Sequence, residues 1–183
     1  MKHPKLTSYQ MTAAALMSAV LCVLAPLSLP VGIVHLSLAN LVICFAAWLL
    51  GARLATLSVG LYLALGAAGL PVFTGYGAGF SKLAGPTGGY LVGYLFMAAI
   101  GGWFIEKSNG QPLLSGLGLA LGIAVSYLCG TAWFMLQMSC PLHTALTICV
   151  YPFIPFDLLK IGVSCVAGPL LRHRLRQAGA RIR

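Results

Sequence analysis

Long apolar runs, each close to 20 residues, follow one another along almost the whole of this 183-residue chain. A run of that length matches a helix that crosses the hydrocarbon core of a membrane. Only 7% of the residues are charged, whereas a soluble domain carries roughly a quarter. The runs leave no room for a soluble catalytic domain, so we expect residues 1–183 to form a single integral membrane domain.

The apolar runs predict an all-α, polytopic membrane protein with six transmembrane helices. The expected helices cover residues 8–29, 36–50, 54–70, 88–105, 112–138 and 156–171, and a short helix or turn is expected at 142–151. Two pairs of glycines, Gly89/Gly93 and Gly118/Gly122, have the spacing that lets membrane helices approach closely. We expect these pairs to pack inside the bundle.

The positions of the basic residues predict the orientation in the membrane. With six spans, nine of the eleven Lys and Arg residues fall on one side, namely Lys2, Lys5, Arg53, Lys107, Arg172, Arg174, Arg176, Arg181 and Arg183. Cytoplasmic loops are rich in Lys and Arg, so both termini are expected in the cytoplasm. The formal charge of +9 is thereby explained by topology and contact with anionic lipid, and it does not indicate a nucleic-acid partner.

This orientation gathers three long connections, 26–37, 71–87 and 139–155, on the outer face. Irregular backbone at membrane depth is tolerated where it lines a cavity, so these connections are expected to cover an outward-facing pocket. The segment "GYGAG" is not a dinucleotide motif, because Phe80 stands where the last glycine would be. Its backbone is expected to approach a ligand, with aromatic walls supplied by Phe73, Tyr76, Phe80 and Tyr90.

One charged pair lies in the outer half of the last helix. Asp157 and Lys160 are three residues apart in "PFIPFDLLKIG" and therefore share one helix face. Charges inside a membrane are costly and are functional by default, so the pair is expected to bind a small polar ligand. The alternative is a structural ion pair in which Lys160 extends outward to the membrane surface.

Catalysis and metal binding are not supported. The chain has no GxSxG, HExxH, Walker or paired-carboxylate motif, so a polytopic membrane enzyme is the least favoured class. Six cysteines form no CxxC pair and have no histidine at ligand spacing. Cys140 and Cys149 share a loop region and a disulfide between them is the remaining option. No cofactor and no metal is expected.

Three motifs together resemble the BioY family, the biotin-specific substrate-binding (S) components of energy-coupling factor (ECF) transporters. They are "GLPVF" at 69–73, "GPTGGYLVGY" at 85–94 and "PFIPFDLLKI" at 152–161. The likeness extends over residues 8–171. It implies a six-helix protein of the plasma membrane that captures biotin from outside. Its partners would be membrane lipid, a transmembrane coupling protein and two ATPase subunits.

The resemblance also implies site residues. Ala15 and Ala19 resemble the surface through which such components dock on the coupling protein. The substrate-binding residues would be Asp157, Lys160, Tyr90, Gly88, Gly89, Thr74, Gly75, Gly79, Phe73, Lys82 and Asn40.

The chain departs from the family pattern at several positions. "HLSLAN" replaces a Pro-[Ile/Val]-Thr-Leu-Gln motif, so His35 stands for the proline and Ala39 for the glutamine, with Asn40 beside it. Phe156 replaces a glycine, and Leu91 stands where some relatives carry an arginine. Lys160 and then Lys82 are therefore the expected partners of the ligand carboxylate. The alternatives are an S component for another vitamin and a biotin transporter that works without ATPases.

Overall fold

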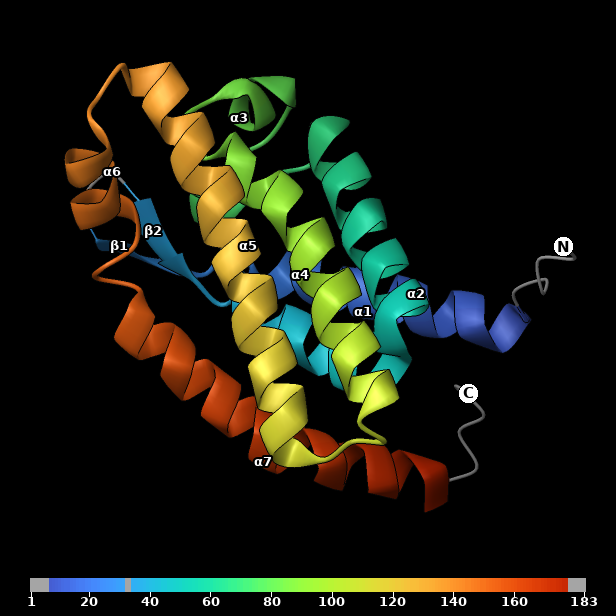
Figure 1. The fold of residues 1–183 in the computed structure, drawn as a ribbon. Coiled ribbons are helices and arrows are strands. Elements are labelled where there is room, and N and C mark those ends of the chain that lie inside the picture. The colour runs from blue at the N-terminus through green and yellow to red at the C-terminus, as the bar shows by residue number, and fades with distance from the viewer. Residues whose placement is uncertain (1–6, 32–33, 178–183) are drawn as a thin grey trace, which may run out of the picture.

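The computed structural model describes residues 7–31 and 34–177. Apart from one short hairpin the described chain is helical (Figure 1), which confirms the all-α class. Its elements are α1 (Ser8–Leu24), β1 (Ser28–Val31), β2 (Val34–Ser37), α2 (Ala39–Ala67), the 3-10 turn η1 (Thr74–Tyr76), α3 (Phe80–Ala84), α4 (Gly88–Lys107), α5 (Pro112–Met138), α6 (Leu142–Cys149) and α7 (Ile154–Gln177).

The helices α4, α5 and α6 begin where the sequence predicts them and end within two residues of the predicted positions. Pro112 occupies the first turn of α5, where its missing N–H costs nothing and its fixed φ favours a helix. The helix α7 is longer than predicted, because it continues into the basic segment as far as Gln177. The predicted cytoplasmic residues Lys2, Lys5, Arg181 and Arg183 lie outside the described residues.

The first helix ends at Leu24, five residues earlier than predicted. Pro26 cannot donate a backbone hydrogen bond, and the chain turns into the β1–β2 hairpin, in which Ser28 pairs with Ser37 and Val31 with Val34. The Ser37 hydroxyl donates to the Ala25 carbonyl (2.9 Å) and accepts from the Ala39 N–H (3.0 Å). The predicted connection 26–37 is thus an ordered hairpin fastened to the end of α1 and the start of α2.

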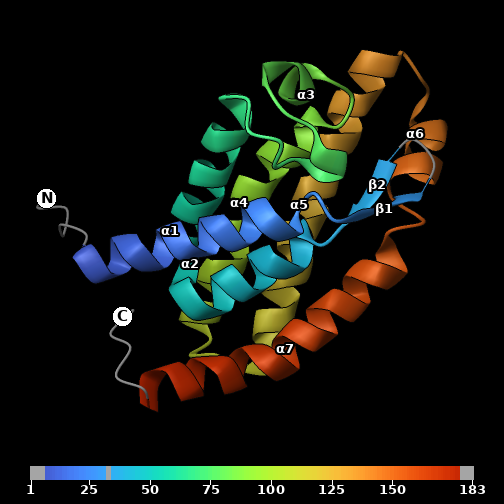
Figure 2. The ribbon, with the colours of Figure 1, turned by 180° about the vertical axis from the view of Figure 1, so that it is seen from behind.

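The second and third predicted helices form one element, α2, with a break at Gly51. Gly51 has φ 77° and ψ −179°, a conformation that is essentially restricted to glycine. The two halves, 39–50 and 52–67, therefore point in different directions, as Figure 2 shows. The Glu106 carboxylate accepts a hydrogen bond from the Ala52 N–H (3.0 Å) and so caps the second half.

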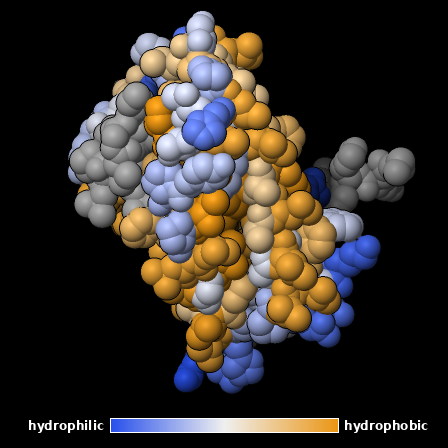
Figure 3. Space-filling view, turned by 60° about the vertical axis from the view of Figure 1, so that its left-hand side comes forward, coloured by the Kyte–Doolittle hydropathy of each residue, from blue (hydrophilic) through white to orange (hydrophobic). Residues whose placement is uncertain are grey.

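Four helices, α2, α4, α5 and α7, are long and apolar enough to cross a membrane, and α1 is a shorter apolar helix. Large apolar side chains face outward along them, among them Leu128 (71% exposed) and Val166 (70% exposed). Figure 3 shows that hydrophobic side chains cover the middle of the molecule in that view. A soluble monomer rarely exposes so much contiguous apolar surface, whereas lipid covers it without cost.

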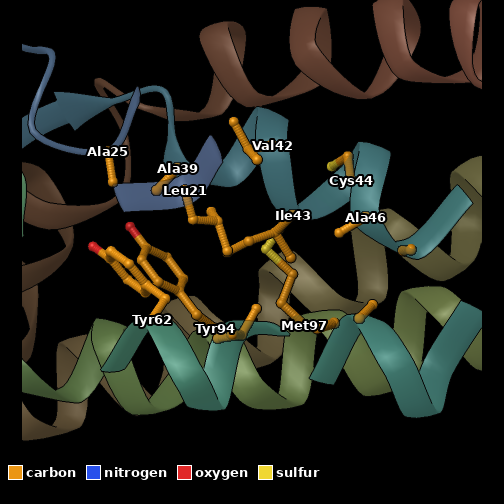
Figure 4. Close-up of a cluster of buried hydrophobic side chains, with 14 of the residues drawn as sticks. Leu21, Ala25, Ala39, Val42, Ile43, Cys44, Ala46, Tyr62, Tyr94 and Met97 are labelled. Carbon is orange, nitrogen blue, oxygen red and sulfur yellow. The ribbon is translucent and has the colours of Figure 1, made fainter. Parts of the chain in front are cut away.

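The core lies where α1, both halves of α2 and α4 meet. Leu21, Ile43 and Met97 are fully buried there, and Figure 4 shows them close to the rings of Tyr62 and Tyr94. The ring of Phe73 packs edge-on against Tyr62, with 5.6 Å between the centroids. This cluster holds α1, α2 and α4 together beneath the site described below.

The contact between α4 and α5 depends on glycines. A Cβ added at Gly93 would lie 2.8 Å from the Cα of Ser126, and one at Gly122 would lie 3.0 Å from the Met97 carbonyl oxygen. The predicted packing of the glycine pairs inside the bundle is confirmed, since Gly89 and Gly118 also face the neighbouring helix.

The hairpin, α3 and α6 gather at one end of the bundle, which we call the loop end (Figures 1 and 2). The Gly75 N–H donates to the Pro26 carbonyl (3.3 Å), and the Trp133 indole N–H donates to the Gly85 carbonyl (2.9 Å). The three long connections predicted to meet on one face are therefore brought together. The Gly51 bend and the α4–α5 connection lie at the opposite end.

Candidate ligand-binding site

A cavity of about 60 Å³ lies at the loop end. Its wall combines a compact polar cluster with aromatic and aliphatic side chains from the surrounding helices. The lining residues are Ser37, Asn40, Phe73, Thr74, Lys82, Thr87, Tyr90, Leu91, Tyr94, Ile123, Ser126, Tyr127, Cys149, Phe153, Asp157 and Lys160.

The predicted charged pair is the centre of the polar cluster. Lys160 Nζ lies 3.0 Å from Asp157 Oδ1 and also donates to the Ser37 carbonyl (2.9 Å). Both residues are buried, with 3% of Asp157 and 9% of Lys160 exposed. The alternative in which Lys160 extends outward is therefore wrong, because its ammonium group turns inward to the hairpin and the carboxylate.

Two neutral side chains complete the surroundings of Asp157. The Asn40 amide Nδ2 donates to both carboxylate oxygens (3.3 and 3.2 Å), and the Tyr127 hydroxyl donates to Oδ2 (2.6 Å). A buried charge is stable only when it is paired and hydrogen-bonded. Asn40 from α2, Tyr127 from α5 and Lys160 from α7 thus converge on the carboxylate of Asp157. Lys160 in turn binds the Ser37 carbonyl at the end of β2.

Aromatic residues form much of the remaining wall. Tyr90 and Phe73 line the cavity as predicted, and the Tyr90 hydroxyl donates to the Cys149 carbonyl at the end of α6 (3.3 Å). The prediction was wrong for Tyr76 and Phe80, which are not lining residues and are 65% and 74% exposed. The tight turn closed by the hydrogen bond from Phe73 to Gly77 (3.0 Å) directs Phe73 inward and leaves Tyr76 outside.

Of the predicted binding residues, Asn40, Phe73, Thr74, Lys82, Tyr90, Asp157 and Lys160 line the cavity. The four predicted glycines do not, and the backbone gives another reason for each. Gly75 and Gly79 have φ angles of 68° and 80°, which residues with a side chain rarely adopt, and their N–H groups donate to the Pro26 and Gly66 carbonyls. A Cβ at Gly88 would collide with the Leu83 carbonyl, and one at Gly89 would lie 2.6 Å from the Cys129 carbonyl.

Sequence reasoning missed several lining residues, above all Tyr127. Its signal was the polar pair Ser126-Tyr127 inside the apolar run 112–138, because polar side chains in a membrane helix usually face the bundle interior. Ser37 gave no such signal, since it contributes its backbone carbonyl to Lys160. Cys149, also a lining residue, is a free thiol, as is Cys140, so the disulfide considered from the sequence is absent.

The predicted docking residues Ala15 and Ala19 lie away from the cavity. Both are exposed on α1, whereas Ala14, Ser18 and Leu21 form the buried face of that helix. Two small residues, one turn apart, thus leave a shallow strip on the outer surface of the bundle.

Comparison with known proteins identifies the family. The BioY family model matches residues 1–177. The chain is 33% identical to the biotin transporter BioY2 of Lactococcus lactis subsp. cremoris, over 96% of this chain and 95% of that one. It is 34% identical to the biotin transporter BioY of Thermotoga maritima, over 86% of this chain and 92% of that one.

A solved structure has the same fold. The crystal structure of the S-component for biotin from an ECF-type ABC transporter superimposes with a TM-score of 0.84. The sequences are 32% identical, and the match covers 92% of this chain and 95% of that one. Together with its apolar helices, these matches establish a multi-pass membrane protein. The chain belongs to the BioY family.

Proposed function

We propose that this chain captures biotin in the cavity at the loop end and acts as the S component of an ECF transporter. The observation that carries the proposal is the buried cluster of Asn40, Tyr127, Asp157 and Lys160 in the wall of an otherwise largely aromatic and aliphatic cavity. Biotin combines apolar fused rings with a polar ureido group, and this wall complements both. The relatives bear the names of biotin transporters, which supports transport and gives no support to an enzyme.

The ligand carboxylate is assigned to Lys82. Lys160 is held by Asp157 and Ser37, and Leu91 presents an apolar side chain to the cavity. Lys82 lines the cavity, and no hydrogen bond joins its ammonium group to any of the described residues. We therefore place Lys82 ahead of Lys160, which reverses the order expected from the sequence.

A bicyclic ligand needs more room than the cavity of about 60 Å³ provides. One water molecule requires roughly 10–15 Å³ by the same kind of measure, so the present space holds only a few. Binding must therefore widen the cavity. The segment 71–87, which carries Phe73, Thr74 and Lys82, is the part of the wall that we expect to move, since it contains only short helical turns.

Isothermal titration of the purified protein with biotin tests the proposal. We expect a dissociation constant in the micromolar range or tighter, and no displacement of biotin by thiamine or riboflavin. Lys82→Met is expected to weaken biotin binding about tenfold, because a charge-assisted contact contributes roughly 1.5–3 kcal/mol. The variant should bind biotin amide, which lacks the carboxylate, as well as the wild type does. An absence of heat with biotin, or displacement by another vitamin, would contradict the assignment.

We infer six membrane spans with both termini in the cytoplasm of the producing cell. The spans would be α1, the two halves of α2 on either side of Gly51, α4, α5 and α7. Six spans place both termini on one side, and nine of the eleven Lys and Arg residues fall on that side, which the positive-inside rule makes cytoplasmic. A fluorescent protein that folds only in the cytoplasm should fluoresce when it is fused to the C-terminus; a dark, intact fusion would reverse the orientation.

The partners of an ECF transporter are a transmembrane coupling protein and two ATPases, and we propose that α1 docks on the coupling protein. The exposed Ala15 and Ala19 give the close approach that small residues one turn apart permit between membrane helices. Leucine at both positions would fill that strip without touching the cavity.

The double variant Ala15→Leu/Ala19→Leu is expected to lose most biotin uptake in cells that contain the coupling proteins. Its biotin affinity in detergent should stay unchanged, because the cavity lies elsewhere. Ala64→Leu/Ala124→Leu, which adds the same bulk at exposed positions of α2 and α5, is the matched control and should transport normally. Full uptake by the Ala15/Ala19 variant, or by cells without ATPase subunits, would favour a transporter that works alone.

A further inference from the structure

Another cavity, of about 420 Å³, lies at the end of the bundle opposite the loop end, beside the α4–α5 connection (Figures 1 and 2). The cavity at the loop end is about 60 Å³, whereas pockets that bind small molecules have roughly 300–1,000 Å³. We call the larger one the bend-end cavity, because it adjoins the helix that begins after the Gly51 bend. Its wall includes Trp48, Glu106, Asn109, Gly110, Arg172 and His173.

Two neighbouring residues of α7 supply hydrogen-bond donors to this wall. A Cβ added at Gly110 would lie 3.4 Å from Arg172 Nη1 and 3.5 Å from Trp48 Cζ3, so the glycine leaves room for the guanidinium beside the indole. His173 Nε2 lies 3.0 Å from Gln177 Nε2. An amide nitrogen only donates, so the neutral imidazole accepts at Nε2 and carries its hydrogen on Nδ1.

Trp48 adds a donor that lacks an acceptor. Its side chain is buried, with 1% of the residue exposed, and its indole N–H donates to no residue in the described ranges. A buried donor without an acceptor is costly and calls for an explanation. Guanidinium, imidazole and indole N–H groups in one wall match a group that is rich in acceptor oxygens, and phosphate is the anion that Arg binds best.

The same wall contains a carboxylate. Glu106 Oε1 accepts the Ala52 N–H (3.0 Å), and a carboxylate accepts about four hydrogen bonds, so Glu106 can cap α2 and face a cation at once. Glu106 also lies in the last turn of α4, where the helix end carries a partial negative charge. Both features oppose an isolated phosphate ion. A group that joins a phosphate to an ammonium ion suits both signs of charge.

The surroundings of the bend-end cavity are those of the membrane surface. Trp103 is half-exposed near the end of α4, and the Lys107 ammonium lies over its ring, 4.8 Å from the centroid. Tryptophan is enriched at the membrane–water interface, and lysine extends from there to the head groups. Leu170 and Leu171, directly before Arg172, are exposed apolar side chains. The cavity thus lies at head-group depth and has an apolar surface beside it that suits acyl chains.

We propose that the bend-end cavity binds the head group of one zwitterionic phospholipid that carries a primary ammonium group. Arg172 and His173 donate to the phosphodiester oxygens, and Glu106 accepts from the ammonium group. The acyl chains lie along the exposed leucines of α7. This site is separate from the proposed biotin site, and it does not depend on what the loop-end cavity binds.

Native mass spectrometry of the detergent-purified protein, titrated with lipid, tests the proposal. The wild type is expected to bind a first molecule of phosphatidylethanolamine about tenfold more tightly than phosphatidylglycerol, which has no ammonium group. Phosphatidylcholine should be about tenfold weaker as well, because its quaternary ammonium group has no N–H to donate to a carboxylate. Glycerophosphoethanolamine, the soluble head group alone, should bind far more weakly than the lipid, since it buries no acyl chain.

Two variants assign the two charges. Arg172→Gln should lose about tenfold in affinity for phosphatidylethanolamine, because one charge-assisted contact with the phosphate is removed. Glu106→Gln keeps an oxygen that can accept the Ala52 N–H, and it should bind phosphatidylethanolamine and phosphatidylglycerol equally well. Arg174→Gln, at an exposed position of α7 outside the cavity wall, is the matched control and should bind as the wild type does. Unchanged biotin affinity of all three variants shows that they are folded.

Several results would overturn the proposal. Equal affinity of the wild type for the three lipids, or tighter binding of phosphatidylglycerol, would contradict the choice of a zwitterion without any variant. A soluble head group that binds as tightly as the lipid would mean that the ligand is a soluble phosphate ester. An Arg172→Gln protein that keeps the wild-type preference, or an Arg174→Gln protein that loses it equally, would place the lipid outside this cavity.

Discussion

Lys160→Met is expected to lower the free energy of unfolding by about 3–5 kcal/mol and to abolish measurable biotin binding. The magnitude is that of breaking a buried ion pair from one side. Asp157 is 3% exposed, so its carboxylate would be left without a cation in a membrane interior. The loss of Lys160 also releases the Ser37 carbonyl at the end of the hairpin. Thermal unfolding in detergent micelles, followed by tryptophan fluorescence, measures the change.

Two further variants separate the charge from the shape of the side chain. Lys160→Met/Asp157→Asn removes both charges and should recover much of the lost stability while still failing to bind biotin, because a neutral pair is not costly to bury. Lys107→Met is the control, since Lys107 is an exposed lysine that lies over the Trp103 ring, 4.8 Å from its centroid, and it should change the stability by less than about 1 kcal/mol. Wild-type stability of Lys160→Met would contradict the role assigned to the buried ion pair.

The parts of the site that follow from helical spacing could be predicted from the sequence. Asp157 and Lys160 lie three residues apart in a helix, so they had to share a face, and the structure places their charged groups 3.0 Å apart. Their inward direction could not be predicted, since it depends on the rotation of α7 against the hairpin. The same reason explains Tyr127, whose position in the cavity depends on how α5 packs against glycines of α4.

The glycine-rich segment shows a second reason why the site could not be predicted in full from the sequence. A glycine permits close approach of the backbone, but the sequence does not say whether a ligand or another helix approaches. At Gly89 the neighbour is α5, and at Gly88 it is the carbonyl of Leu83. The side chains around these glycines were equally ambiguous, since one tight turn sends Phe73 into the core and leaves Tyr76 at the surface. The geometry of the local turn determines which of these side chains faces inward, and the pattern of apolar residues in the sequence does not predict it.

A polar cluster whose members are already bonded to one another has a functional advantage. Because Asp157 holds Asn40 and Lys160 before the ligand arrives, little side-chain freedom remains to be lost on binding. Such preorganisation raises affinity without adding contacts. The widening that a bicyclic ligand needs is therefore expected away from this cluster, in the segment 71–87, which contains only short helical turns.

Gly51→Ala is expected to destabilise the protein by about 2–4 kcal/mol. Part of this cost is the backbone strain of a side chain at φ 77° and ψ −179°, which is roughly 1–3 kcal/mol. The remainder is the lost cap, worth about 0.5–2 kcal/mol, because the new Cβ would collide with the Glu106 carboxylate that accepts the Ala52 N–H. Thermal unfolding of the variant in detergent gives the value.

Gly60→Ala is the matched control, because it lies in the second half of α2 and a Cβ there would meet only Leu95 Cδ2, at 4.0 Å. Replacing a glycine by alanine inside a helix raises the free energy of unfolding by about 1 kcal/mol, so this variant should unfold at a slightly higher temperature. The contrast tests the number of spans as well as the local strain. If residues 39–67 crossed the membrane once as a continuous helix, Gly51→Ala would stabilise the protein as Gly60→Ala does. A stabilised Gly51→Ala protein would therefore mean that α2 is a single span and that the count of six is wrong.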